Sequence, residues 1–190
     1  MSDRPLTEPI DPFPSPVLCP TDKEGENING ARFGCSRNGL KTWHGGLDLK
    51  AEEGTPFKAV YGGKVPKGGI RKIDESSADY KKGVGQFVIV RSKDFSIKYC
   101  HLQSIDVKEG DKIEVGQVLG KTGKSGNAYT VPFKHLHIEL STDHFVSMKN
   151  YVDPEPYLAT SYGDNPNSPN HADCKGFSPE ELDFVRIEEQ

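Results

Sequence analysis

The stretch Lys134-His135-Leu136-His137-Ile138-Glu139-Leu140 alternates polar and apolar side chains along its whole length. Alternate residues of a β-strand point to opposite faces, so the pattern predicts a strand with one face on a hydrophobic core. The opposite face carries His135, His137 and Glu139. Two imidazoles two positions apart project into the same space, and neutral imidazole is a common zinc ligand. Taken alone, the stretch is compatible with a metal site and with a solvated polar face, so other ligands must distinguish the two.

The middle of the chain consists of short segments with strand character, separated by turns that contain glycine. Helical periodicity is absent from 44–140, and 20 glycines, 14 prolines and an apolar fraction of 34% agree with a turn-rich fold. We therefore expect an all-β, mainly antiparallel sandwich or partly closed barrel with long loops at 66–85 and 123–134. The predicted strands are 57–60, 64–65, 86–91, 96–102, 112–115, 118–121 and 135–140, with a further strand pattern around Leu47 and Leu49.

Three regions differ in composition. Residues 1–30 are rich in proline and acidic residues, which predicts an extended N-terminal arm. Residues 31–158 form the predicted domain. In the C-terminal extension, 159–190, a capping box with proline begins at Ser178, so we expect one short helix that packs on the domain.

Charge and hydropathy exclude several classes of function. The net charge of −4 gives no electrostatic case for binding nucleic acid or an anionic membrane surface. No apolar run approaches the roughly 20 residues that span a bilayer, so no transmembrane segment is expected.

The sequence as given starts without a basic region followed by an apolar region, so no signal peptide is visible. This agrees with a cytoplasmic protein, with a leader that has been removed, or with export by a route that needs none.

The four cysteines, Cys19, Cys35, Cys100 and Cys174, contain no Cys-x-x-Cys pair, which argues against a thiolate zinc site. Their even number permits two disulfides in an oxidising compartment. Cys19 with Cys35 is the favoured bridge because both lie in one loop-rich segment. Free buried thiols are the alternative.

Histidines elsewhere in the chain favour a metal site. His44 and Asp48 are four residues apart, and in an extended segment such positions face the same way. With one imidazole from 134–140 they would supply two nitrogens and one carboxylate oxygen, leaving a fourth position for water as in catalytic zinc sites. By the same alternation, His101 is expected to share a face with Ile97 and Tyr99.

These residues resemble the motifs of the lysostaphin/LytM family of zinc endopeptidases. The resemblance rests on His44-x-x-x-Asp48, on Tyr99-Cys100-His101-Leu102 and on His135-Leu136-His137-Ile138-Glu139. The connecting segments 54–65 and 107–123 and the Asp153-Pro154 turn are also similar to the family pattern. It covers about residues 32–158 and implies a LytM-like β-sandwich, also described as a barrel-sandwich hybrid.

The resemblance implies one zinc ion (Zn2+) per chain, held by His44, Asp48 and His137. It places His101 and His135 beside the zinc-bound water as groups that handle protons, and it leaves Glu139 as support for the site or as a solvated edge. In some family members a tyrosine donates to the oxyanion, and Tyr80 occupies a comparable place, although a loop aromatic lining the cleft is the favoured interpretation of this residue.

Some positions depart from the family pattern or leave its details open. Cys100 replaces the small residue usual before the histidine, and the link 126–134 is longer than usual, which concerns substrate fit rather than the metal. In latent members an upstream asparagine fills the fourth zinc position, and Asn27 and Asn29 lie in the corresponding region.

Three functions follow as hypotheses. The first is a zinc endopeptidase that hydrolyses stem or cross-link peptides of bacterial peptidoglycan. The second is a non-catalytic LytM-like factor that binds and activates a cell-wall amidase, which is ranked lower because no ligand is missing. The third, a biotinyl- or lipoyl-type carrier, lacks the lysine setting that such carriers need.

A wall substrate implies action in the periplasm, in the envelope or outside the cell. With no visible signal, one hypothesis is a toxin delivered by a contact-dependent route such as type VI secretion, with an inhibitor or immunity protein as partner. Either a glycine bridge or a D-alanyl–diaminopimelate cross-link could be the bond cut.

Overall fold

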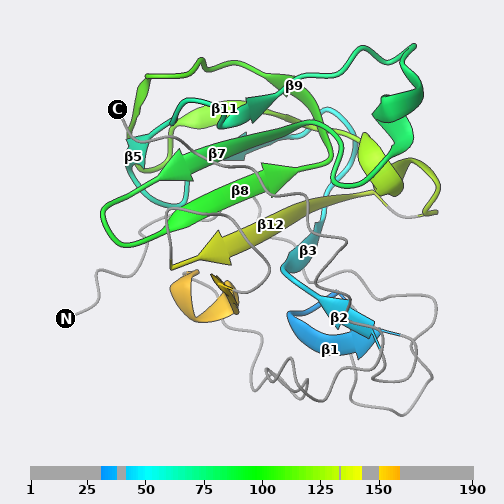
Figure 1. Ribbon diagram of the computed structural model, residues 1–190, viewed down its shortest axis with the longest axis horizontal. Coiled ribbons are helices and arrows are strands. Elements are labelled where there is room, and N and C mark those ends of the chain that lie inside the picture. Colours follow the sequence, from blue (N-terminus) through cyan, green and yellow to red (C-terminus); the bar gives the residue numbers. More distant parts are fainter. Residues whose placement is uncertain (1–30, 38–41, 133, 143–149, 159–190) are drawn as a thin grey trace.

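A computed structural model describes residues 31–37, 42–132, 134–142 and 150–158 (Figure 1). These residues form short strands joined by turns and three 3-10 helices of three or four residues each. The strands are β1 (Gly34–Arg37), β2 (Thr42–His44), β3 (Leu47–Lys50), β4 (Pro56–Lys58), β5 (Gly63–Lys64), β6 (Ile70–Arg71), β7 (Phe87–Arg91), β8 (Ser96–Cys100), β9 (Leu102–Ile105), β10 (Lys112–Ile113), β11 (Val118–Thr122), β12 (His135–Ser141) and β13 (Tyr151–Val152). The helices are η1 (Ala78–Lys81), η2 (Gly126–Tyr129) and η4 (Glu155–Tyr157).

The strands are arranged in one large sheet and two small ones. The large sheet has the order β10-β5-β7-β8-β12-β13, with β6 paired to β7 and β3 paired to β12. A second sheet has the order β4-β11-β9, and β1 pairs with β2 in a hairpin. All of these pairs are antiparallel, which confirms the predicted all-β, mainly antiparallel fold class.

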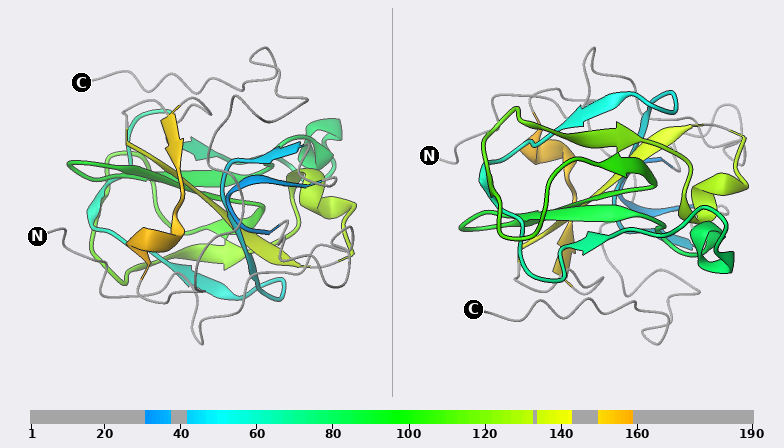
Figure 2. Two further views of the ribbon diagram at one scale, coloured as in Figure 1. Left: turned by 90° about the horizontal axis from the view of Figure 1, so that it is seen from below. Right: turned by 90° about the horizontal axis from the view of Figure 1, so that it is seen from above.

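The large sheet is covered on both faces, as Figure 2 shows from two sides. One face packs on the three-stranded sheet, where Phe57 and Tyr99 bring their ring centroids to 5.4 Å. The other face carries a smaller cluster that includes Phe33, Trp43 and Tyr151. Successive residues of the central strands alternate between the two clusters, as the pleat requires.

Strand β12, which carries His135 and His137, pairs with other strands on both of its edges. One of its edges pairs with β8, and its other edge pairs first with β3 and then with β13. Leu136, Ile138 and Leu140 enter the main core, as 134–140 predicts. The polar face of β12 is therefore turned toward the side that carries the smaller cluster.

The predicted strand 96–102 is wrong at its C-terminal end. Strand β8 ends at Cys100, and His101 adopts a left-handed backbone conformation with φ of 61° before β9 begins. No other non-glycine residue in the described part of the chain has a positive φ. The left-handed backbone at His101 breaks the alternation of side chains along the strand. His101 therefore does not share a face with Tyr99, contrary to the expectation from that alternation.

Several expectations lie outside the described residues. They include the N-terminal arm 1–30, the C-terminal extension 159–190 with its helix, and Asn27 and Asn29. The predicted domain boundaries therefore stay a prediction. None of the helices in the described part is long and apolar enough to cross a membrane.

Candidate metal centre

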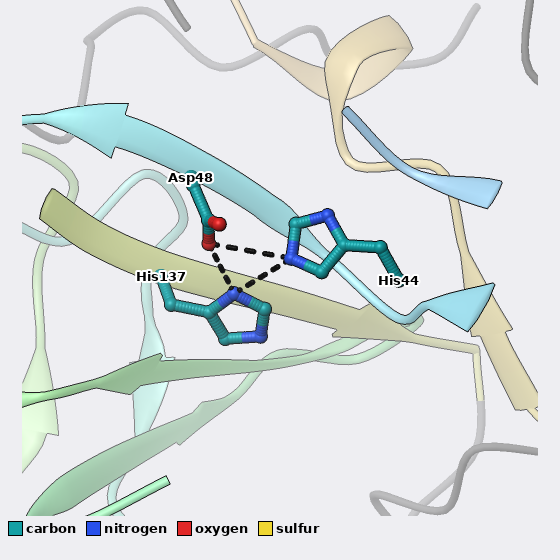
Figure 3. Close-up of side chains that lie close together, drawn as sticks. All are labelled: His44, Asp48 and His137. Carbon is teal, nitrogen blue, oxygen red and sulfur yellow. Dashed lines mark hydrogen bonds and ion pairs between the residues drawn. The ribbon is translucent and has the colours of Figure 1, made fainter. Parts of the chain in front are cut away.

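Two strands and a hairpin end bring His44, Asp48 and His137 together (Figure 3). His137 on β12 lies directly opposite Asp48 on β3, and His44 is the last residue of β2. Their candidate ligand atoms all lie within 4.8 Å of one another, and the three residues are buried. The fold thus brings His137 to His44 and Asp48, which lie 93 and 89 residues before it in the sequence.

Gly46 allows the chain to approach β12 between His44 and Asp48. A Cβ atom at Gly46 would overlap the carbonyl oxygen of Ile138 and would press on the ring of His137. Only glycine avoids this contact with the backbone of the facing strand. The short segment between β2 and β3 can therefore approach the edge of β12 closely enough to bring both ligand candidates near His137.

The distances within the cluster fit a zinc ion. Ligand atoms about 2.0–2.2 Å from a tetrahedral zinc are separated from one another by roughly 3.3 Å. His44 Nε2 lies 3.2 Å from His137 Nδ1 and 3.3 Å from Asp48 Oδ1. The third separation, between His137 Nδ1 and Asp48 Oδ1, is 2.6 Å, which is the length of a hydrogen bond without a metal. A small opening of this contact would complete the tetrahedral spacing.

The protonation of the cluster without a metal follows from its contacts. Burial alone would lower the pKa of His137, but hydrogen bonds to Asp48 and Glu139 raise that pKa to about 9. Burial would raise the pKa of Asp48, yet the neighbouring His44 and His135 and the hydrogen bond from His137 hold it well below its usual value. His137 is therefore protonated on both ring nitrogens, and its Nδ1 proton lies on the side of the ring where a bound cation would lie.

The ring nitrogens that face away from the cluster are also held. His44 Nδ1 lies 3.1 Å from the carbonyl oxygen of Arg32, and the Arg32 guanidinium contacts both oxygens of Glu155 at 2.7 and 2.6 Å. His137 Nε2 lies 3.2 Å from Glu139 Oε1. Because an N–H must donate in each of these contacts, His44 directs Nε2 and His137 directs Nδ1 toward the cluster. Glu139 is only 6% exposed, so it is not a solvated edge.

His101 and His135 lie beside the cluster. The ring of His101 meets that of His135 edge-on at 4.9 Å and lies 5.7 Å from that of His137, measured between centroids. His135 Nε2 is 3.8 Å from Asp48 Oδ1. His101 Nδ1 donates to the carbonyl oxygen of Ser125 at 2.8 Å, which leaves Nε2 as the basic nitrogen.

Burial lowers the pKa of His101 well below its usual value, and the nearby His135 and His137 lower it further. His101 is thus held as a neutral imidazole. Its unusual backbone is held by a hydrogen bond from its own N–H to the carbonyl oxygen of Val84. This conformation turns the ring toward His135 and away from the main core.

Tyr80 lies on η1 and packs against Tyr129 of η2, with ring centroids 6.3 Å apart in an edge-on contact. Burial, followed by the charges of Glu75 and Glu53, raises its pKa. The ring contact described for Tyr80 is thus with another loop aromatic rather than with the histidines. Its assignment as an oxyanion donor stays a prediction.

Sequence reasoning missed four residues that support the site: Lys98, Tyr151, Arg32 and Ser125. Lys98 and Tyr151 contact Glu139, while Arg32 and Ser125 use backbone carbonyl groups. The even spacing from Glu139 to His137 was the one available signal, because it places both side chains on one face. A backbone carbonyl leaves no signal in the residue type.

Cys100 is a free, buried thiol, so an arrangement with two disulfides is excluded. Burial, together with the charges of Glu139 and Asp48, raises its pKa well above the usual value. Cys19 and Cys174 and the side chain of Cys35 lie outside the described part of the structure. The preference for a Cys19–Cys35 bridge therefore stays a prediction.

A buried His–Asp–His cluster on an antiparallel sheet, with two further histidines beside it, is an arrangement typical of metal-dependent hydrolases. The model of peptidase family M23 matches residues 42–154, a segment that contains all five of these residues. The chain belongs to this family, and the resemblance to lysostaphin and LytM-type enzymes is confirmed.

Named relatives include peptidoglycan endopeptidases. The chain is 31% identical over 126 residues to the glycyl-glycine endopeptidase ALE-1 of Staphylococcus capitis, covering 66% of this chain and 32% of that protein. It is 35% identical over 92 residues to the peptidoglycan DD-endopeptidase ShyC of Vibrio cholerae, covering 48% of this chain and 20% of that protein. The chain thus spans a third or less of these relatives.

The catalytic domain of lysostaphin from Staphylococcus simulans superposes with a TM-score of 0.54 at 27% identity. The match covers 69% of this chain and 91% of that domain. The described fold is therefore that of lysostaphin-like catalytic domains, and the named relatives support a hydrolase.

Proposed function

We propose that the protein is a zinc-dependent endopeptidase that hydrolyses peptides of bacterial peptidoglycan. The observation that carries this proposal is the buried cluster of His44, Asp48 and His137, whose donor atoms have the spacing of zinc ligands. When bound there, zinc would lower the pKa of a coordinated water and polarise the scissile carbonyl group. The proposal places the reaction in the cell envelope or outside the cell, as for the peptidoglycan-directed relatives.

In this proposal His101 and His135 move the protons. His101 Nδ1 is occupied by the carbonyl oxygen of Ser125, so Nε2 is free to accept a proton from the attacking water. The same nitrogen can return the proton to the amine that leaves. His135, edge-on to His101, is positioned to orient it and to share this role. Tyr80 is retained as a candidate donor to the oxyanion.

The non-catalytic alternative, a factor that activates a wall amidase, has no observation in its favour because all three ligand candidates are in place. The carrier hypothesis does not fit membership of a peptidase family. Delivery as a type VI toxin and an inhibitor partner are not tested by the structure and stay predictions.

Metal content and digestion of purified sacculi test the proposal together. The wild-type protein is expected to carry about one zinc per chain and to release soluble peptides, and Asp48→Ala and His137→Ala should lose both properties. Asp94→Ala, an exposed carboxylate in the turn between β7 and β8, is the matched control and should lose neither. A wild-type protein that holds no zinc and leaves sacculi intact refutes the proposal.

The relatives' names point to two different bonds, one between glycines and one of the DD-endopeptidase type. Digestion of defined muropeptides with either a glycine bridge or a D-alanyl–diaminopimelate cross-link, analysed by mass spectrometry, decides which is cut.

A further inference from the structure

Glu139 uses both of its carboxylate oxygens within the protein. Oε1 lies 3.2 Å from His137 Nε2, and Oε2 accepts from the Tyr151 hydroxyl at 2.6 Å and contacts Lys98 Nζ at 3.1 Å. The partners come from β8, β12 and β13, which are neighbouring strands of the large sheet. The network therefore lies across the strands next to the candidate metal centre.

Lys98 is the unusual member of this network. It lies directly opposite Glu139 in the pairing of β8 with β12, and it is only 3% exposed. Its ammonium group also sits 4.8 Å from the centroid of the Phe87 ring. Lysine is almost never so fully buried unless it is paired, so the pair is a specific feature of this interior.

Stability is a poor explanation for such a pair. Removing two charges from water costs as much as their attraction returns, and apolar replacements of buried ion pairs are often neutral or stabilising. Glu139 also makes a contact that an apolar side chain could not make, namely with the outward ring nitrogen of His137. The pair is thus better explained by what it does to His137.

We propose that Glu139, Lys98 and Tyr151 form a positioning unit for His137. Glu139 accepts the Nε2 proton, so the ring angle that directs Nδ1 toward Asp48 and His44 is set before a metal arrives, and Nε2 is the nitrogen that keeps its proton when Nδ1 binds the metal. Lys98 balances the carboxylate charge, and the Tyr151 hydroxyl fixes the second oxygen. The unit rests on the proposed function, because it acts on a residue proposed to hold zinc.

Two multiple variants, both expected to fold, distinguish a positioning role of this network from a purely structural role. The neutral pair, Lys98→Met with Glu139→Gln, removes both charges but keeps an acceptor oxygen for His137. The apolar triple, Lys98→Met with Glu139→Leu and Tyr151→Phe, removes the acceptor as well. Neither leaves an unpaired charge in the sheet, so both are expected to fold. Ile97→Val, which trims the neighbouring side chain on the core face of β8, is the control for altered packing.

The readouts are the zinc Kd by competition with a chelator and the visible absorption of the Co2+-substituted protein. The apolar triple should bind zinc about 10- to 100-fold more weakly than the wild type, with a changed Co2+ spectrum. The neutral pair should fall between the two, and Ile97→Val should match the wild type. Melting temperatures of the metal-free variants should not follow this order.

A triple variant whose zinc Kd lies within twofold of the wild-type value, with the same Co2+ spectrum, overturns the proposal. If the triple variant does not fold, the neutral pair provides the test. A zinc Kd and a Co2+ spectrum equal to those of the wild type in the neutral pair then overturn the proposal. Zinc binding by the wild type, measured without substrate, tests the metal centre separately. Failure of the proposed function and failure of the positioning unit are therefore distinguishable.

Discussion

Replacing His101 with asparagine separates the proposed proton transfer from metal binding. The backbone of His101 is left-handed, with φ of 61°, and asparagine adopts this conformation more readily than other residues with a Cβ. The substitution therefore removes the imidazole without adding the strain that alanine would bring. His101→Gly, which tolerates the same φ, is the companion variant.

The expected magnitudes follow from the contacts of the ring. A positioned general base contributes about 100- to 10,000-fold to the rate, which corresponds to roughly 3–5 kcal/mol of the activation barrier. The folded state loses the hydrogen bond to the Ser125 carbonyl oxygen, worth about 1 kcal/mol net. The ring centroid lies 5.7 Å from that of His137, so the ligand cluster itself is not dismantled. Turnover should thus collapse while folding and zinc content change little.

The assay measures both quantities on the same preparation. Zinc is quantified after dialysis against a weak chelator, and turnover is followed as soluble peptide released from dyed sacculi. His44→Asn is the control for a true ligand and should lose zinc together with activity. Loss of zinc from His101→Asn would show that His101 is a ligand, and retained turnover would show that it is not the base. Either result refutes the division of roles among the five residues.

Three further predictions concern the same region. Without metal, the lowered pKa of Asp48 stabilises the folded state, and this stability is lost as the pH falls through 3.8 and below. The raised pKa of His137 also stabilises the folded state, and this stability is complete below pH 6.5 and is lost as the pH rises toward 9. Because the lowered pKa of His101 makes stability fall as the pH drops below 6.5, melting curves with chelator should be highest near pH 6.5 and should decline toward pH 9. A zinc-loaded sample that shows the same alkaline decline contradicts this account. Cys100 should resist iodoacetamide at pH 8 until the protein is denatured, as peptide mapping by mass spectrometry can check, because it is buried and its pKa is raised. Gly46→Ala should cost about 1–3 kcal/mol by chemical denaturation and should weaken zinc binding, whereas Gly110→Ala, which has open space around it, should leave zinc binding unchanged.

The polar and apolar faces of β12 could be predicted because alternation is a local property of a strand. Leu136, Ile138 and Leu140 enter the core, and His135 and His137 face the other way. His44 and Asp48 also carried a local signal through their spacing. The pairing of β3 with β12 could not be predicted from spacing, because it joins residues 89 apart, such as His137 and Asp48, whose partnership depends on the whole fold.

His101 shows where such reasoning fails. An expected strand through 96–102 puts His101 on the face of Tyr99, and only the left-handed residue brings it to His135. A histidine in this conformation is uncommon, and it is maintained by tertiary hydrogen bonds from its backbone to Val84 and from its ring to Ser125. Neither partner is a side-chain group, so residue types could not reveal them.

The packing of the core also explains why the ligands meet. Leu47 and Leu49 are fully buried on either side of Asp48, and each contributes about 1.5–3 kcal/mol through burial. A slip of β3 by one residue along β12 would turn both leucines out of the core and would direct Asp48 into it. The register that places Asp48 opposite His137 is thus enforced by apolar side chains on the far face of the same strand. The hydrophobic core selects the geometry of the candidate metal centre without touching it.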